Sequence, residues 1–120
     1  MLWLAAAVTF FIGAMHSYLT ETIILPRLLA VPNLPLLQKN RGFTERLHRL
    51  VWHLVTVYIW AAAALLAVLA YQPANLARAI GLTIAGTFVA SAIFCLAVGP
   101  RHPAWPLFLV ASAITAYTVW

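Results

Sequence analysis

Apolar residues fill four long runs of the chain, and most charged residues stand between the runs. The runs cover residues 2–25, 45–71, 76–98 and 104–120. A helix needs roughly 17–25 residues to cross the hydrocarbon core of a bilayer, so the first three runs are long enough and the last is at the lower limit. A segment alone in lipid must satisfy its own backbone hydrogen bonds, which favours helix. The pattern predicts an all-α polytopic membrane protein, with one domain (1–120) folded as an antiparallel bundle of four transmembrane helices.

Residues with special backbone preferences mark the expected ends of these helices. Pro26 is expected to end the first helix, since proline lacks an N–H group and clashes with the preceding turn. Thr44, followed by Glu45, resembles the start of the second helix, and Asn75 is expected to cap the third. The two later connections are short, so the last three helices should be antiparallel neighbours in chain order.

The composition agrees with a lipid environment. Hydrophobic residues make up 65 % of the chain and charged residues 8 %, against roughly 45–50 % and 25 % in soluble domains. A net charge of +5 would suggest nucleic acid in a soluble protein, but basic residues also flank membrane spans and face anionic head groups. The expected partner is therefore the lipid bilayer, and not a nucleic acid. The single cysteine, Cys95, excludes an intramolecular disulfide and a cysteine-based zinc site.

The basic residues gather at one end of the predicted helices. Six of them lie at the connections before the second and fourth helices: Arg27, Lys39, Arg41, Arg46, Arg49 and Arg101. Only Arg78 lies at the opposite end. Cytoplasmic loops of membrane proteins carry the excess of Lys and Arg. The charge bias therefore predicts that both termini are external and that these two connections are cytoplasmic.

This topology collects all the histidines in the cytoplasmic half of the protein, together with both acidic residues. The histidines are His16, His48, His53 and His102. A helix turns by about 100° per residue, so His16 shares a stripe with the small and polar residues Thr9, Gly13 and Thr20. Such a stripe is typical of a helix–helix contact in a membrane. On the second helix, His48 lies about 140° round from His53, so we do not expect these two to bind one ion together.

One interpretation of the histidines is a ligand site. His16 and His53 would form it, with Glu21 and His102 as further ligands. Two histidines on facing helices suit the axial positions of a b-type haem iron, and two or three histidines plus a carboxylate suit zinc or non-haem iron. An ionisable residue within a span is a functional hypothesis by default.

The other interpretation is structural. Neutral His16 and His53 would hydrogen-bond Thr, Ser or carbonyl groups across helices. Glu21 would pair near the surface with an arginine such as Arg27 or Arg49. The sequence leaves both interpretations open.

Two further groups of residues are candidates for contact with lipid or protein. Arg46, Arg49 and Arg101 are candidates to bind a lipid phosphate at the inner surface. Gly81 and Gly86 make one face of the third helix small, which favours close packing within the bundle or with another subunit.

Three segments carry a resemblance to known proteins: HSYLTETIILPRLL (16–29), ERLHRLVWHLVTVYIW (45–60) and RHPAWPLFLV (101–110). Together they resemble a group of uncharacterised small bacterial four-helix membrane proteins. The resemblance implies a location in the bacterial inner membrane and implies no activity. The small multidrug-resistance transporters also carry a single glutamate in their first helix, but here Glu21 lies near the helix end and is followed by TIILPR.

Three classes of function are consistent with these features. The first, favoured by the small size and short loops, is an accessory or structural bundle that packs in an oligomer or a larger membrane complex. The second is a metal- or b-haem-binding membrane protein that uses the histidines of the cytoplasmic side. The third is a small proton-coupled transporter, for which Glu21 is the support. An enzyme acting on a soluble substrate is not expected, because no nucleophile–base pair is visible in the sequence.

Overall fold

The computed structural model describes residues 1–99 and 102–120, and every regular element in these residues is helical. The elements are α1 (Leu2–Leu19), a π-helical turn η1 (Thr20–Ile24), α2 (Leu25–Leu29), a 3₁₀ turn η2 (Leu37–Lys39), α3 (Arg41–Tyr71), α4 (Leu76–Val98) and α5 (Ala104–Val119). The prediction of an all-α protein is confirmed.

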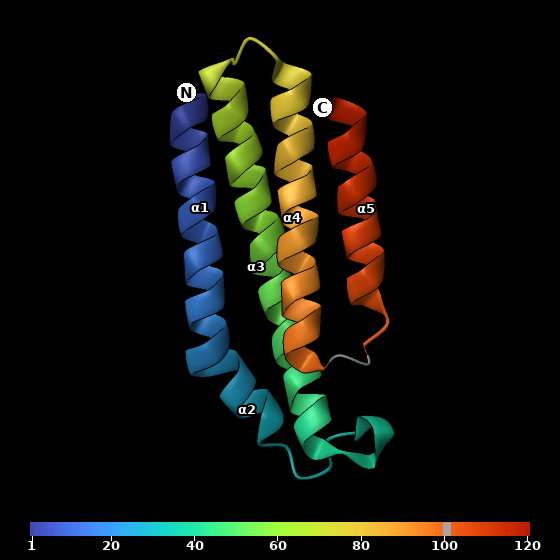
Figure 1. Cartoon of the computed structure of the whole chain (residues 1–120). Coiled ribbons are helices and arrows are strands. Elements are labelled where there is room, and N and C mark those ends of the chain that lie inside the picture. Colours follow the sequence, from blue (N-terminus) through green and yellow to red (C-terminus); the bar gives the residue numbers. More distant parts are fainter. Residues whose placement is uncertain (100–101) are drawn as a thin grey trace.

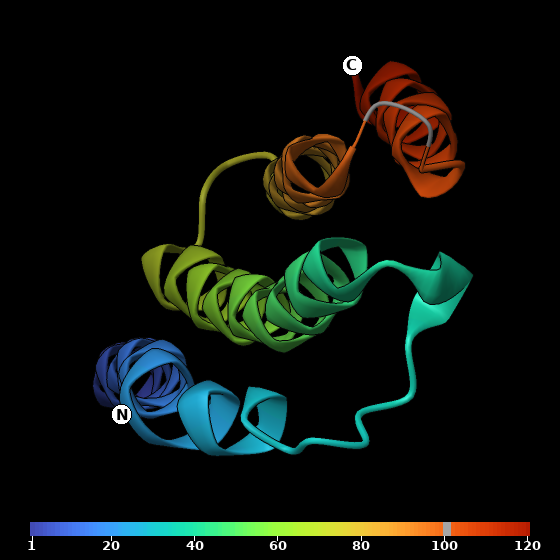
Figure 2. The same cartoon turned by 90° about the horizontal axis from the view of Figure 1, so that it is seen from below.

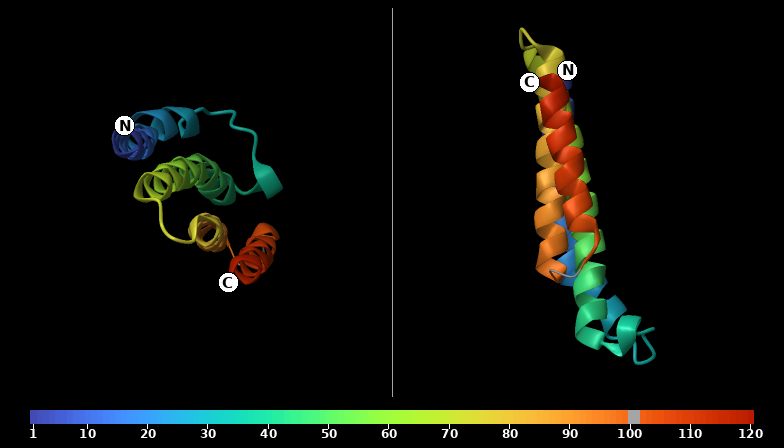
Figure 3. Two further views of the ribbon diagram at one scale, coloured as in Figure 1. Left: turned by 90° about the horizontal axis from the view of Figure 1, so that it is seen from above. Right: turned by 45° about the vertical axis from the view of Figure 1, so that its right-hand side comes forward.

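The four long helices stand side by side in a single row (Figure 1). α1 packs against α3, α3 against α4, and α4 against α5, so neighbours in the row are also neighbours in the chain. Seen along the helices, the row is curved and open, with α1 and α5 at its two edges (Figures 2 and 3). The molecule measures 55 × 32 × 14 Å, which is thin in one direction because no second layer of helices covers the row.

Successive long helices run in opposite directions. Along the helix axes, both termini lie at the same end of the molecule as the α3–α4 connection (Figure 1). Three helical segments are long and apolar enough to cross a membrane: Leu2–Leu29, α3 and α4. α5 is apolar but has 16 residues. At 1.5 Å per residue it spans about 24 Å, which is less than the roughly 30 Å of a bilayer core.

The expected helix end at Pro26 is wrong, because the helix continues to Leu29 through a change of pitch. In η1 the backbone widens, so that the N–H group of Leu25 donates to the carbonyl of Thr20, five residues earlier. Pro26 then falls in the first turn of α2, where its missing N–H group does little harm. α2 bends away from the axis of α1 and runs towards the beginning of α3 (Figure 1).

The expected start of the second long helix near Thr44 is also wrong. α3 begins at Arg41, because the side chain of Asn40 accepts a hydrogen bond from the Phe43 N–H group and caps the helix. Thr44 lies inside the first turns, buried, and its hydroxyl receives the Leu37 N–H at 2.9 Å. Thr44 therefore fixes the η2 turn onto α3. The predicted Asn75 cap is present, since its side chain accepts from the Arg78 N–H group.

The helices approach closely where small residues lie between them. A Cβ atom built at Gly13 would lie 2.6 Å from the Trp60 ring, and one built at Gly81 would overlap Val119. Thr20 is fully buried and Thr9 half-buried, as the predicted contact stripe of α1 requires. Gly86 is exposed with open space above it, so its predicted role in packing stays a prediction for contact with another chain.

Candidate functional site

A connected group of polar side chains lies between α1 and α3. His53 on α3 is the centre: its Nδ1 atom lies 2.7 Å from Ser17 Oγ, and its Nε2 atom lies 2.8 Å from Glu21 Oε1. The second carboxylate oxygen of Glu21 accepts a hydrogen bond from Arg49. We call Ser17, Glu21, Arg49 and His53 the α1–α3 polar cluster.

The chemistry of the partners fixes how protons are placed in this cluster. A carboxylate only accepts hydrogen bonds, so Nε2 of His53 carries a proton directed at Glu21. In the neutral ring, Nδ1 then accepts the hydroxyl proton of Ser17. Both ring nitrogens and both carboxylate oxygens therefore have partners within the chain.

Helical spacing explains why these four residues meet. Ser17 and Glu21 are four residues apart on α1 and η1, and Arg49 and His53 are four residues apart on α3. Residues with this separation lie on one face of a helix, one turn apart. Two such pairs on facing helices form a compact square of donors and acceptors.

Exposure changes along the cluster. The side chain of His53 is 20 % exposed, that of Glu21 is 36 % exposed and that of Arg49 is 47 % exposed. The cluster thus leads from the contact between α1 and α3 outward to the surface at Arg49. The Glu21–Arg49 pair agrees with one of the two arginine partners expected from the structural interpretation.

His16 lies beside this cluster and has other partners. Its Nδ1 atom is 3.0 Å from the hydroxyl of Thr56, a buried residue of α3. Its ring is 5.7 Å from that of Trp52. Thr20 donates to the backbone carbonyl of His16 at 2.6 Å. His16 therefore joins the two helices through a hydroxyl, separately from Glu21.

The structure brings together only part of the predicted ligand set. His53 and Glu21 are in contact, but His102 lies at the connection before α5, where its Nδ1 atom accepts from the Ala104 N–H group. Within residues 1–99 and 102–120, no group of three or more His, Cys, Asp or Glu side chains is arranged to hold a metal ion. His48 bonds the Thr44 carbonyl of its own helix. The metal or haem site stays a prediction, and it would require His53, whose two ring nitrogens both have partners, to exchange one of them for the ligand.

Sequence inspection missed the pair formed by Ser17 and His53, which with Glu21 gives a hydroxyl, an imidazole and a carboxylate in series. Such a series resembles the arrangement that activates a nucleophilic serine. Ser17, however, lies inside α1, where backbone N–H groups are committed to carbonyls of the preceding turn. Paired backbone donors for an oxyanion, which acyl transfer needs, are not offered by that helical turn. The series is suited to holding or passing a proton.

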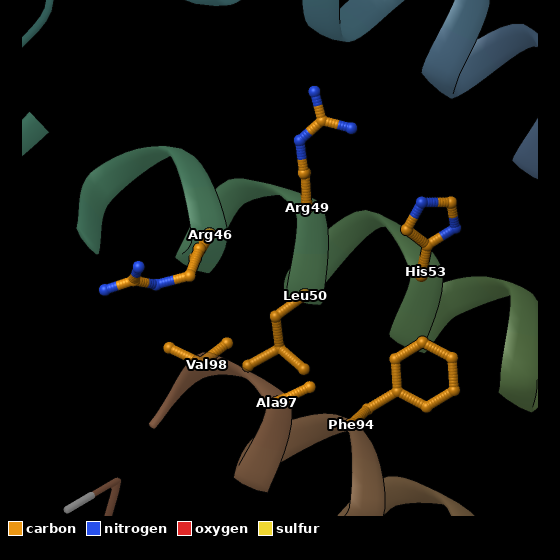
Figure 4. A pocket seen from close by; sticks show the side chains of 7 residues that line it. All are labelled: Arg46, Arg49, Leu50, His53, Phe94, Ala97 and Val98. Atoms are coloured by element: carbon orange, nitrogen blue, oxygen red, sulfur yellow. The ribbon is translucent and has the colours of Figure 1, made fainter. Parts of the chain in front are cut away.

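A second feature is a cavity of about 230 Å³ between the first turns of α3 and the last turns of α4. Its lining residues are Arg46, Arg49, Leu50, His53, Phe94, Ala97 and Val98. Figure 4 shows the apolar side chains of Leu50, Ala97 and Val98 between the two helices, whereas Arg49 extends on the side of α3 away from α4. Arg101, the third predicted phosphate ligand, lies outside the described residues.

The fold and these contacts define a small helical protein with three helices able to cross a membrane. No family model matches the chain, and neither a curated protein nor a solved structure shows significant similarity to it.

Proposed function

We propose that this protein is a multi-pass membrane protein that acts as an accessory or structural subunit, packing with copies of itself or within a larger membrane complex. The observation that carries this proposal is the open row, 14 Å thin, whose strongest polar cluster is already satisfied inside the chain. A site waiting for a ligand would leave donors or acceptors unpaired, whereas the His53 and Glu21 atoms have partners.

The apolar surface of the row supports association within lipid. Large side chains at the two edges are well exposed, among them Phe11 on α1 and Leu107, Ile114 and Tyr117 on α5. Lipid chains cover such surface at no penalty, so exposure alone does not demand a partner. Gly86 on α4 gives a reason to expect a protein partner, because small residues allow close approach of a second helix backbone. No described atom lies within 4 Å of a Cβ built at Gly86.

The proposed location is the bacterial inner membrane. In the proposed topology both termini are external, and the α2–α3 and α4–α5 connections are cytoplasmic. The charge bias supports this orientation. Five of the described basic residues lie at the end of the molecule that holds the α2–α3 connection, and among the described residues only Arg78 lies at the opposite end. α5 would cross the membrane as the shortest span, with local thinning of the bilayer.

Association in the membrane tests the proposal. Cross-linking in native membranes, followed by mass spectrometry, should recover this chain joined to itself or to defined partner subunits. Gly86→Leu should lower the yield of the cross-linked species several-fold, because the added side chain blocks close approach. The matched control is Ala62→Leu, a small-to-large change at an exposed position of α3. A chain that stays monomeric and unlinked, or a yield equally insensitive to both substitutions, would contradict the proposal.

The α1–α3 polar cluster supports one other candidate function, proton-coupled transport. Carboxylate and histidine groups in series are used as proton relays in membrane transporters. In that case, reconstituted protein should show proton-coupled flux that Glu21→Gln abolishes. Vesicles without such flux, together with cross-linked complexes, would favour the accessory role.

A further inference from the structure

We propose that an anionic phospholipid binds between α3 and α4, with its phosphate group on Arg46 and one acyl chain in the cavity beside Leu50, Phe94 and Val98. This inference goes beyond association with protein partners and rests on the proposed placement and orientation in a membrane. Of the three arginines that the sequence suggested as phosphate ligands, Arg46 is the one assigned to the phosphate group here.

Arg46 has a charge that no other residue of the described part neutralises. The protein has two acidic residues, and both are occupied: Glu21 pairs with Arg49 and His53, and Glu45 pairs with Arg41 at 3.0 Å. Arg49 is therefore directed at α1, away from α4, as Figure 4 shows. Arg46 makes no ion pair within the described residues and is exposed.

The cavities around Arg46 distinguish it from the other cations at this end. Arg46 lines the 230 Å³ cavity described above, which we call the apolar cavity. It also lines a second cavity of about 730 Å³, the polar cavity, with Gln38, Phe43, Val98, Gly99, His102 and Pro103. Arg46 and Val98 are the residues that the two cavities share.

The order of these environments matches that of a phospholipid. The apolar cavity follows α3 and α4 into their membrane-spanning parts, lined by Leu50, Phe94, Ala97 and Val98. The polar cavity lies at the connections, with the amide of Gln38 and the imidazole of His102 in its lining. The acyl chain would lie against the apolar side chains of the apolar cavity, and the phosphate would contact the guanidinium of Arg46. The polar head group would lie beside the hydrogen-bonding groups of the polar cavity. A guanidinium also matches phosphate oxygens with two parallel N–H donors.

The depth of Arg46 is suitable for a head group. It lies five residues after the start of α3 at Arg41, or about 7.5 Å along the helix axis. A long basic side chain at this depth extends towards the membrane surface while its aliphatic part stays against apolar side chains. The inner leaflet is rich in anionic lipid, so the ligand is present where the site is.

Binding is measured on delipidated protein in detergent, so that neither orientation nor a partner complex affects the result. The probes are phosphatidylglycerol and phosphatidylcholine, followed by native mass spectrometry at physiological salt. We expect phosphatidylglycerol to bind with a stoichiometry of one and Arg46→Gln to weaken it by about tenfold or more, as for loss of a hydrogen-bonded charge. Arg27→Gln is the matched control, because it removes the same charge at the same end but lines neither cavity; it should change the affinity by less than about twofold.

A second variant tests the acyl-chain part of the site without changing charge. Ala97→Phe should fill the apolar cavity and also lower phosphatidylglycerol binding several-fold, whereas inorganic phosphate should not displace the lipid. Equal losses in Arg46→Gln and Arg27→Gln would overturn the proposal in favour of general charge attraction. Displacement by inorganic phosphate, with no effect of Ala97→Phe, would overturn it in favour of a simple anion site. Circular dichroism establishes that each variant is folded before its affinity is compared.

Discussion

His53 and Glu21 join α3 to the π-helical turn of the first segment through a 2.8 Å contact between Nε2 and Oε1. The two residues are 32 positions apart in the chain. Each lies one helical turn from a second member of the cluster on its own helix. Ser17 supports His53 from α1, and Arg49 supports Glu21 from α3. The His53–Glu21 contact is therefore flanked by two further hydrogen bonds between the same helical segments, one from Ser17 to His53 and one from Arg49 to Glu21.

The first prediction concerns the charge of Glu21. Glu21→Gln should lower the free energy of unfolding by about 1 kcal/mol, because the amide no longer offsets Arg49 and accepts at only one oxygen. Thermal unfolding in detergent, followed by circular dichroism, measures the change. Glu45→Gln is the control: its pair with Arg41 is an exposed pair within one helix, and its loss should cost about 0.3–0.5 kcal/mol. Equal effects of the two substitutions would show that Glu21 does not connect the helices in solution.

The second prediction separates the histidines by their partners. His53→Ala removes two interhelical hydrogen bonds and should destabilise the protein by about 1–3 kcal/mol. His48→Ala removes one bond within α3 and should cost less. The same thermal measurement decides between them. A larger loss for His48→Ala would mean that the phase of α3 against α1 is not as described.

The third prediction addresses the metal or haem interpretation directly. If the histidines are structural, purified protein should show no Soret band and no stoichiometric metal, and the His16→Ala/His53→Ala double variant should simply unfold at a lower temperature. Absorption spectroscopy with elemental analysis provides both readouts. A Soret band or a metal that the double variant loses and His48→Ala keeps would replace the accessory role with the ligand-binding one.

The fourth prediction compares two glycines. Gly13→Ala should destabilise the protein by about 1–3 kcal/mol, because the new methyl group would lie 2.6 Å from the Trp60 ring. Displacing that ring would also break its N–H bond to the Phe10 carbonyl and its stacking on Phe10. The methyl group added by Gly86→Ala would meet no atom of residues 1–99 or 102–120 within 4 Å, so this change should be neutral or stabilise the helix by about 0.5–1 kcal/mol. A neutral Gly13→Ala would show that α1 and α3 are further apart than the structure has them.

The fifth prediction concerns orientation. A reporter fused after Trp120 should read as external, and one inserted in the connection between α2 and α3 should read as cytoplasmic, because basic residues are retained on the cytoplasmic side. Reversing the charge bias, with Arg41 and Arg46 changed to Gln and basic residues added beside Arg78, should increase the opposite orientation. A cytoplasmic C-terminus in the unaltered protein would contradict the proposed topology.

Hydropathy and helical phase predict much of this structure. The four apolar runs give the four long helices. The contact stripe of α1 follows from its small and polar residues, and Gly13 and Thr20 are buried as expected. These features are local, so a sequence carries them directly.

Features that depend on competing hydrogen bonds were not predictable in this way. Pro26 reads as a helix end, yet the π turn before it changes the pitch and the helix continues. The sequence suggests Thr44 as the start of the second helix, yet the Asn40 side chain accepts the Phe43 N–H and caps the helix instead. The hydroxyl of Thr44 accepts the Leu37 N–H. The short connections correctly predict that α3, α4 and α5 are neighbours in chain order. The contact of Ser17 with His53 requires in addition the axial register of α1 on α3, and the open row requires that the helices do not close into a compact bundle. Hydropathy contains neither of these two features.

The single row of helices determines how cooperatively this protein can unfold. Among the described residues, most contacts of each long helix are with its neighbours in the row, so stability is close to a sum of three interfaces, as in linear repeat proteins. The α1–α3 interface is held by the polar cluster, while α5 at the other edge is held to α4 by apolar packing, by a hydrogen bond from Ser112 to the Ala85 carbonyl at 2.9 Å, and by the Arg78 guanidinium, which lies 4.3 Å from the centre of the Trp120 ring. Loss of α5 would leave the α1–α3 interface intact, and hydrogen exchange should therefore reach α5 well before it reaches the centre of α3.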